Sequence, residues 1–204
     1  MDEDEFLTIE REQTAEIKVT GSRFIGTAYP ITTEKQASEF IQRISRKFFN
    51  ATHNCYAYQI GSHSVTITRY SDAGEPAGTA GLPILNVING RQLTNVAVVI
   101  TRYFGGTKLG KGGLVRAYSQ CTRQVLDQCS MVKKYLYQKL KLEFDYNLTG
   151  SVMRVISSLH ANIHESIYDK NSTLILYLRK SMVKRFKSDL LETTSGKISI
   201  SEVN

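Results

Sequence analysis

The chain has 204 residues, of which 41% are hydrophobic, and a formal net charge of +7 at pH 7. This composition allows one large domain or two modest ones with real cores and excludes a chain that is disordered throughout. No run approaches the roughly 18 apolar residues of a membrane helix, and the acidic start lacks the apolar segment of a signal peptide. Three cysteines without CxxC spacing predict no disulfide framework, which is typical of a cytoplasmic protein.

The charge is unevenly spread along the chain. Residues 1–16 hold seven carboxylates and one arginine, whereas residues 17–134 hold fifteen Lys/Arg and only five Asp/Glu. Such a field favours an anionic partner, for example RNA, a nucleotide or an acidic protein face. A charged surface that serves solubility alone is the alternative interpretation.

Local patterns in the first part of the chain predict an α/β domain. Alternating residues indicate strands, a 3.6-residue apolar period indicates helices, and an apolar run without alternation indicates a strand buried on both faces. In chain order we predict strands at 14–20 and 23–31, a helix at 33–48, a hairpin of 53–60 and 64–70 around Gly61-Ser62-His63, a loop at 71–81, a helix at 82–90, a buried strand at 95–104, a glycine-rich loop, and a helix at 114–129.

The remainder of the chain shows a different order of predicted strands and helices. Its patterns follow the order β-α-β-β-α-β, which is the ferredoxin-like arrangement. Glycine becomes rare and the charge pattern changes near Val132–Leu136. We therefore predict an α+β protein of two domains, 1–133 and 134–204.

The glycine-rich segment GGTKLGKGG follows the predicted buried strand. Gly105 to Gly110-Lys111 matches most of a P-loop, but Gly112 stands where Ser or Thr would hold magnesium, and the dinucleotide fingerprint also fails. What remains is a group of backbone N–H donors at a helix N-terminus, which suits a phosphate or a carboxylate, unless the glycines serve close packing alone. We predict an anion or nucleic-acid site formed by Arg102, Lys108, Gly110, Lys111, Gly112, Gly113 and Arg116.

The other loop, SDAGEPAGTAG, precedes a second glycine-flanked helix start. Asp72 and Glu75, with His53 nearby, would suit acid–base work or a metal site. However, Asp72 also fits an Asp-x-Gly turn and Thr79 fits a helix cap. We assign His53, Asp72, Glu75 and Thr79 to a second motif loop and predict no catalytic residue, no metal site and no cofactor.

Aromatic residues near these loops discriminate weakly between functions. Five aromatic residues are candidates for stacking on nucleic-acid bases, namely Tyr56, Tyr58, Tyr70, Tyr103 and Phe104. On strands, however, aromatic side chains more often belong to the core.

These segments also resemble a known family. The order ATHNCYAYQI, RYSDAGEPAGTAGLPIL and NVAVVITRYFGGTKLGKGGLVRAY strongly resembles the IMPACT/YigZ family, and flanking segments extend the resemblance over most of residues 1–130. The C-terminal part looks like the second domain of the bacterial members, similar in fold to the last domain of elongation factor G. The resemblance implies an N-terminal βαβ-type domain shared with a ribosomal protein and translocation factors. It brings no catalytic residues with it.

Eukaryotic members of that family act in translational control, so the resemblance implies a translation-linked regulator. We predict a non-enzymatic protein whose basic, glycine-rich face binds RNA, the ribosome or an acidic translation-related protein, and we expect no membrane partner. The alternative is an enzyme acting on a small anionic substrate, with residues 105–113 holding the anion and Asp72 and Glu75 transferring protons. The sequence does not predict an oligomeric state.

Overall fold

In the computed structural model, residues 4–62, 65–169 and 171–203 are described. The chain divides into two compact units, Phe6–Lys134 and a second that consists of Tyr135–Asn204 with Met1–Glu5. The predicted class, α+β in two parts, is confirmed. The proposed division into 1–133 and 134–204 stays a prediction about independent folding. Among the described residues, no helix is long and apolar enough to cross a membrane.

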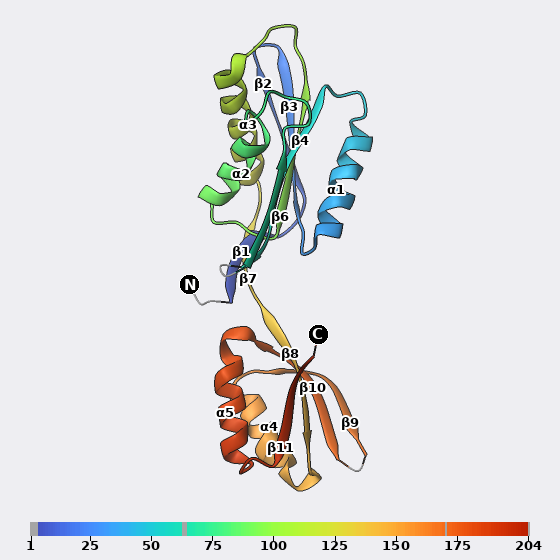
Figure 1. Ribbon diagram of the computed structural model, residues 1–204, viewed down its shortest axis with the longest axis vertical. Helices are drawn as coiled ribbons and strands as arrows, with labels where there is room; N and C mark the ends of the chain where they lie inside the picture. The colour runs from blue at the N-terminus through green and yellow to red at the C-terminus, as the bar shows by residue number, and fades with distance from the viewer. Residues whose placement is uncertain (1–3, 63–64, 170, 204) are drawn as a thin grey trace. The chain divides into compact units, whose positions relative to one another are not determined.

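The larger unit is built on a five-stranded sheet of order β2-β3-β6-β4-β5, in which each neighbouring pair is antiparallel. Strands β3 and β4, joined by α1, therefore run parallel on either side of β6 and form a split βαβ unit. Helix α1 covers one face of the sheet, and α2 with α3 covers the other (Figure 1). The elements up to the second unit are β1 (Glu5–Ile9), β2 (Gln13–Val19), β3 (Ser22–Pro30), α1 (Glu34–Lys47), β4 (His53–Ser62), β5 (Val65–Ser71), α2 (Gly81–Gly90), β6 (Val96–Tyr103), α3 (Gly110–Asp127) and β7 (Met131–Tyr135).

Strand β6 lies at the centre of this sheet and is buried on both faces, as its non-alternating sequence predicts. Val98 and Ile100 pack into the core beneath α2 and α3, while Ala97 and Val99 pack into the core beneath α1. Full burial of such side chains stabilises a fold by about 1.5–3 kcal/mol each. The end of β6, where the glycine-rich segment begins, is therefore firmly held.

Helix α3 begins at Gly110, earlier than the predicted 114. Three glycines that we assigned to a loop, Gly110, Gly112 and Gly113, thus belong to its first turns. With helical backbone angles, as at Gly112 and Gly113, glycine costs a helix about 1 kcal/mol relative to alanine. The fully buried side chains of Tyr118 and Cys121 hold the helix on the sheet, and tertiary packing of this kind outweighs local propensity.

Two short strands were not predicted from the sequence. Strands β1 and β7 pair with each other as a two-stranded sheet. We had interpreted their residues as an acidic start and a domain junction, because pairing between segments so far apart leaves no local pattern. The predicted 53–60 strand extends to Ser62, and His63 of the predicted turn lies outside the described residues.

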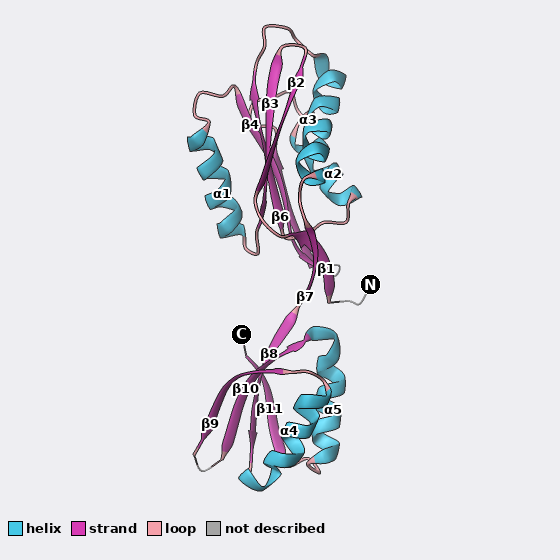
Figure 2. Ribbon diagram, turned by 180° about the vertical axis from the view of Figure 1, so that it is seen from behind, coloured by secondary structure: helices cyan, strands magenta, loops and turns pink. Residues whose placement is uncertain are grey.

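The second unit has the ferredoxin-like strand order β11-β8-β10-β9, with all three pairings antiparallel. This confirms the predicted β-α-β-β-α-β arrangement. Helices α4 and α5 lie on one face of the sheet (Figure 2), where they bury Phe186 against Leu140 and Leu176 of the same core cluster. The elements are β8 (Tyr137–Phe144), η1 (Tyr146–Leu148), α4 (Thr149–Ser158), β9 (Asn162–Tyr168), β10 (Ser172–Arg179), η2 (Lys180–Met182), α5 (Val183–Thr193) and β11 (Ile198–Val203).

Asp4 belongs to this second unit although it lies at the other end of the chain. Its side chain is 1% exposed and accepts hydrogen bonds from Arg179 Nη2 (2.9 Å), Ser181 N (3.1 Å) and Ser181 Oγ (2.8 Å). Burial by itself raises the pKa of Asp4, but Arg179 and Ser181 outweigh it and lower the pKa to about 2. Asp4 is thus fixed to the end of β10 and to η2.

We expect Asp4→Asn to lower the free energy of unfolding of the second unit by about 2–3 kcal/mol at neutral pH, because an amide cannot replace the carboxylate. The folded pKa lies below its ordinary value of 3.8, so this stability is present above about pH 4 and is lost as the pH falls toward 2. Hydrogen exchange of the β8 and β10 amides in the full chain at pH 7 and near pH 3 measures both effects. Asp145→Asn, at a position whose side chain makes no capping hydrogen bond, is the control. Equal protection of wild type and Asp4→Asn at pH 7 would contradict this role.

Candidate nucleic-acid interface

The start of helix α2 is capped by the carboxylate of Asp72. Its Oδ2 accepts a hydrogen bond from Gly78 N (2.8 Å), and its Oδ1 accepts from Ala80 N and Gly81 N (both 2.9 Å). Three backbone donors at a helix start thereby bind an anion supplied by the chain itself. The predicted capping role of Thr79 is wrong, because its hydroxyl donates instead to the carbonyl of Pro76 (2.6 Å).

This cap leaves Asp72 unsuited to proton transfer. Burial raises the pKa of the Asp72 carboxyl, but the three backbone N–H groups outweigh this effect and hold the pKa below its usual value. Both oxygens already accept hydrogen bonds. The contribution of Asp72 to the enzymatic alternative therefore finds no support in the geometry.

Glu75 and Arg102 form a buried ion pair. Arg102 Nη1 lies 2.7 Å from Glu75 Oε1, and the two side chains are 6% and 3% exposed. The hydroxyl of Tyr118 donates a second hydrogen bond to Oε1 (2.8 Å). Burial is the main cause that raises the pKa of the Tyr118 hydroxyl, and the neighbouring Cys55 and Glu75 raise it further. The hydroxyl therefore keeps its proton. The second motif loop, strand β6 and helix α3 are thus linked through a single atom, Glu75 Oε1.

Arg102 therefore differs from the other cations of the predicted site. Its charge is balanced by Glu75, and it also donates to Ser22 Oγ (3.3 Å), so it is not part of an exposed basic surface. The guanidinium lies 5.5 Å from the ring centroid of Phe24 and 5.6 Å from that of Phe104. Its Nε–H has no acceptor among the described residues.

His53 and Cys55 support the second motif loop from beneath. His53 Nδ1 lies 2.9 Å from the carbonyl oxygen of Ala73, and since a carbonyl only accepts, this nitrogen carries the hydrogen. The Cys55 thiol donates to the carbonyl of Asp72 (2.9 Å), and burial raises its pKa to about 12. Both residues thus position the loop, and the Cys55 thiol stays protonated.

The glycines of the 105–113 segment have different structural roles. A Cβ on Gly105 would lie 1.9 Å from the carbonyl carbon of Gly21, so here the backbones of two turns touch and only glycine fits. Gly110 has a φ of +68°, a conformation that other residues rarely adopt, and open space around it. Close packing explains Gly105, whereas at Gly110 the backbone conformation requires glycine and leaves the helix start open.

At the N-terminus of α3 the N-cap residue is Leu109, and no side chain of the described residues is found to accept a hydrogen bond from the first N–H groups, whereas Asp72 does so at α2. Lys108, Lys111 and Arg116 surround it, and all three are exposed. In the described part of the chain no carboxylate pairs with any of them within 4.0 Å. A Cβ on Gly112 would lie 3.5 Å from Arg116 Nη1, which places this guanidinium over the first turn. We call these three residues the α3 edge.

A pocket of about 300 Å³ opens beside the α3 edge. It brings together four residues of the predicted anion site, Arg102, Lys108, Gly110 and Lys111, with Glu75 of the second loop. Sequence reasoning missed its apolar walls, because nothing local indicates that loop residues Pro76 and Leu109 face Leu114 of α3. The lining does not include Gly112, Gly113, Arg116, His53, Asp72 or Thr79.

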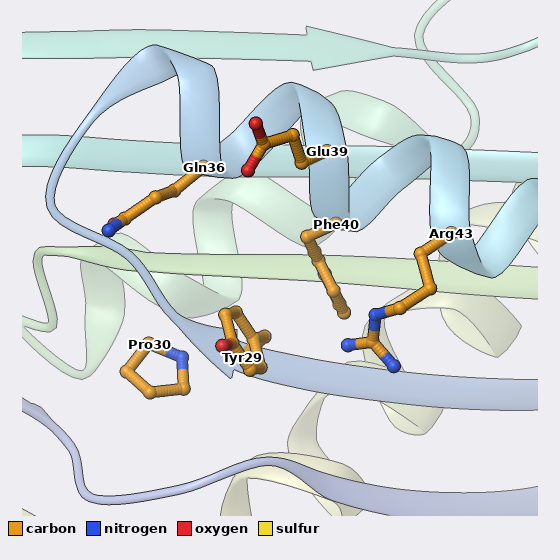
Figure 3. A pocket seen from close by; sticks show the side chains of 6 residues that line it. All are labelled: Tyr29, Pro30, Gln36, Glu39, Phe40 and Arg43. Carbon is orange, nitrogen blue, oxygen red and sulfur yellow. The ribbon is translucent and has the colours of Figure 1, made fainter.

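A second cavity, of about 390 Å³, lies between α1 and β3 (Figure 3). Phe40 stacks on Tyr29 there, with ring centroids 5.1 Å apart, and Arg43 lies 5.3 Å from the Phe40 centroid. Arg43 already forms an ion pair with Glu12, and Gln36 Oε1 accepts hydrogen bonds from Thr32. Its polar groups are thus largely engaged by the protein, in contrast to those of the α3 edge.

Comparison with known proteins places this arrangement in a family. Residues 20–126 match the Impact N-terminal domain, and residues 142–197 match a domain of unknown function, DUF1949. The chain belongs to the IMPACT family. It is 36% identical to the IMPACT family member YvyE of Bacillus subtilis, over 97% of this chain and 90% of the relative. It is also similar to YigZ of Escherichia coli, with 28% identity over 90% of each chain. A crystal structure of a hypothetical protein matches 98% of both chains with a TM-score of 0.73 and 27% identity.

All residues of the pocket and the α3 edge fall inside the matched Impact N-terminal domain. The pocket therefore belongs to the part of the chain that defines membership of the IMPACT family.

We expect Glu75→Ala to lower the free energy of unfolding by about 3–5 kcal/mol, because it leaves the buried guanidinium of Arg102 without its counter-ion. Combining it with Arg102→Met should cost less than the sum of the two single changes, since no uncompensated charge remains. Urea unfolding of the full chain followed by circular dichroism gives the coupling energy. The same cycle on the exposed pair Arg23–Glu16 should yield about 1 kcal/mol or less. Additive effects at Glu75 and Arg102 would refute the coupling.

We expect Asp72→Asn to destabilise the larger unit by about 1–2 kcal/mol at pH 7, because the amide offers one acceptor oxygen instead of two and no charge. The folded pKa of Asp72 is lowered, so its contribution is complete above the usual aspartate pKa of about 3.9 and disappears as the pH falls below it. Thermal unfolding at pH 7 and near pH 3 tests the direction. A variant that is as stable as wild type at pH 7 would show that the cap is dispensable.

Proposed function

We propose that this chain is a cytoplasmic, translation-associated regulatory protein that binds RNA through the α3 edge. One observation carries the proposal. Of two glycine-flanked helix starts in the same unit, α2 is capped by Asp72. At α3, among the residues that the structure describes, no side chain caps the helix and no carboxylate pairs with the three exposed cations around it. Such a site attracts an anion from outside the protein.

Phosphates of RNA suit this edge better than the carboxylates of a protein. Helix N-termini and lysines are common phosphate ligands, and phosphate contacts supply most of the sequence-independent affinity for nucleic acids. The exposed ring of Phe104 beside the edge offers a surface on which a base can stack. An acidic protein partner is the competing possibility, and the experiment below separates the two.

Family membership supports the translational setting. The IMPACT family includes the eukaryotic proteins named IMPACT, and the human one is 30% identical to this chain over 52% of it. The resemblance to this family implies translational control, and the Impact N-terminal domain that this chain matches over residues 20–126 holds the α3 edge.

We expect binding of a short single-stranded RNA to weaken with salt, because each neutralised phosphate releases a counterion. Three contacts imply a log–log slope of about −2, and Lys108→Ala with Lys111→Ala should flatten it by about 1.4. Fluorescence anisotropy between about 50 and 200 mM salt measures both values.

The matched control is Lys35→Ala with Lys47→Ala on α1, which removes the same charge on the opposite face of the sheet. This control should leave the slope unchanged. Absence of RNA binding at the lowest salt, or a slope that the edge variant does not alter, would refute the RNA proposal and favour an acidic protein partner.

A further inference from the structure

The pocket beside the α3 edge has two chemically distinct sides. Pro76, Phe104, Leu109 and Leu114 form apolar walls, and Phe104 remains 47% exposed. Lys108, Lys111 and the uncapped start of α3 form a cationic rim. A ligand that fits both sides carries a flat apolar group and an anionic group close to each other.

The buried side of the pocket adds unused hydrogen-bonding capacity. Glu75 Oε1 is occupied by Arg102 and Tyr118, whereas no hydrogen bond to Oε2 is found among the described residues, and His53 Nε2 lies 3.9 Å from it. Arg102 is 5% exposed, lines the same pocket and keeps its Nε–H without an acceptor. Buried groups of this kind rarely stay unpaired without a functional reason.

We propose that this pocket binds a single nucleotide. The base stacks on Phe104 between the apolar walls with its edge toward Glu75, and the phosphate lies at Lys108, Lys111 and the first N–H groups of α3. The inference rests on the proposed function, because it names the ligand class of the same edge. The nucleotide is either free in solution or the 5′-phosphorylated end of an RNA.

The size of the pocket agrees with this ligand class. Its volume of about 300 Å³ lies at the lower end of small-molecule sites, so it accommodates one base with its phosphate and excludes a helix or a folded stem. The cavity between α1 and β3 is larger, but its only cation, Arg43, is already paired with Glu12.

Phe104→Ala separates stacking from charge. Stacking on an aromatic side chain contributes about 1–3 kcal/mol per base, so this variant should bind 5′-phosphorylated RNA about 5- to 150-fold more weakly than wild type. Its salt slope should not change, because no phosphate contact is removed. Phe49→Ala, which truncates an equally large exposed ring outside the pocket, should leave affinity unchanged.

The ligands tested are AMP, adenosine, inorganic phosphate, and one short RNA with a 5′-phosphate or a 5′-hydroxyl. Displacement of the RNA by AMP, far better than by adenosine or phosphate, is expected. Tighter binding of the 5′-phosphorylated RNA assigns the pocket to an RNA end, and equal binding of the two RNAs assigns it to a free nucleotide.

The failures of the two proposals are distinguishable. If Phe104→Ala binds every ligand like wild type while the lysine variant flattens the salt slope, the nucleotide pocket is refuted and RNA binding stands. Competition by inorganic phosphate equal to that by AMP also refutes it. If RNA does not bind but AMP does, and Phe104→Ala abolishes AMP binding, the pocket stands and the RNA function falls.

Discussion

The carboxylate of Glu75 is the point on which the geometry of the candidate site depends. A buried arginine needs a counter-ion, and Glu75 supplies it from the second motif loop. Because Tyr118 of α3 donates to the same oxygen, the loop, the central strand and the helix are held together. The position of the pocket walls follows from this junction, since Pro76 is the next residue of the loop and Phe104 follows two residues after Arg102.

The two glycine-flanked helix starts show how one physical problem is solved in two ways. Both leave backbone N–H groups pointing out of the first turn with a partial positive charge. At α2 the chain satisfies them with Asp72, and the start of the helix becomes a closed structural unit. At α3 Gly110 provides an open, left-handed entry without a side chain, and the charged groups nearby are the cations Lys108 and Lys111, which cannot accept hydrogen bonds from these N–H groups. The contrast separates a helix start that the chain caps itself from one that we propose binds an external anion.

Pairing between distant segments of the chain also fixes the N-terminal residues. Asp4 reaches Arg179 and Ser181 across nearly the whole length of the chain, and β1 pairs with β7. Neither contact can be recognised from a local sequence pattern. Both hold the N-terminal segment in place, although its composition alone indicates only an acidic start. The acidic N-terminus is therefore not simply a charged tail, because at least one of its carboxylates is buried and paired.

Much of this protein could be predicted from its sequence because the relevant signals are local. The period of apolar residues determines the helices and strands, and the unbroken run at 95–104 identifies β6 as a strand buried on both faces. The ordered motifs over residues 51–118 identify the family and the two loops that matter. What a side chain in those loops does was decided only by the tertiary structure. Whether Asp72 caps a helix, whether Arg102 is exposed or buried against Glu75, and whether Phe104 faces a pocket all depend on which distant groups lie within hydrogen-bonding or van der Waals distance. The sequence determines the type and charge of each residue. Which side chains are buried, and which groups they bond to, is decided only when separate segments pack together.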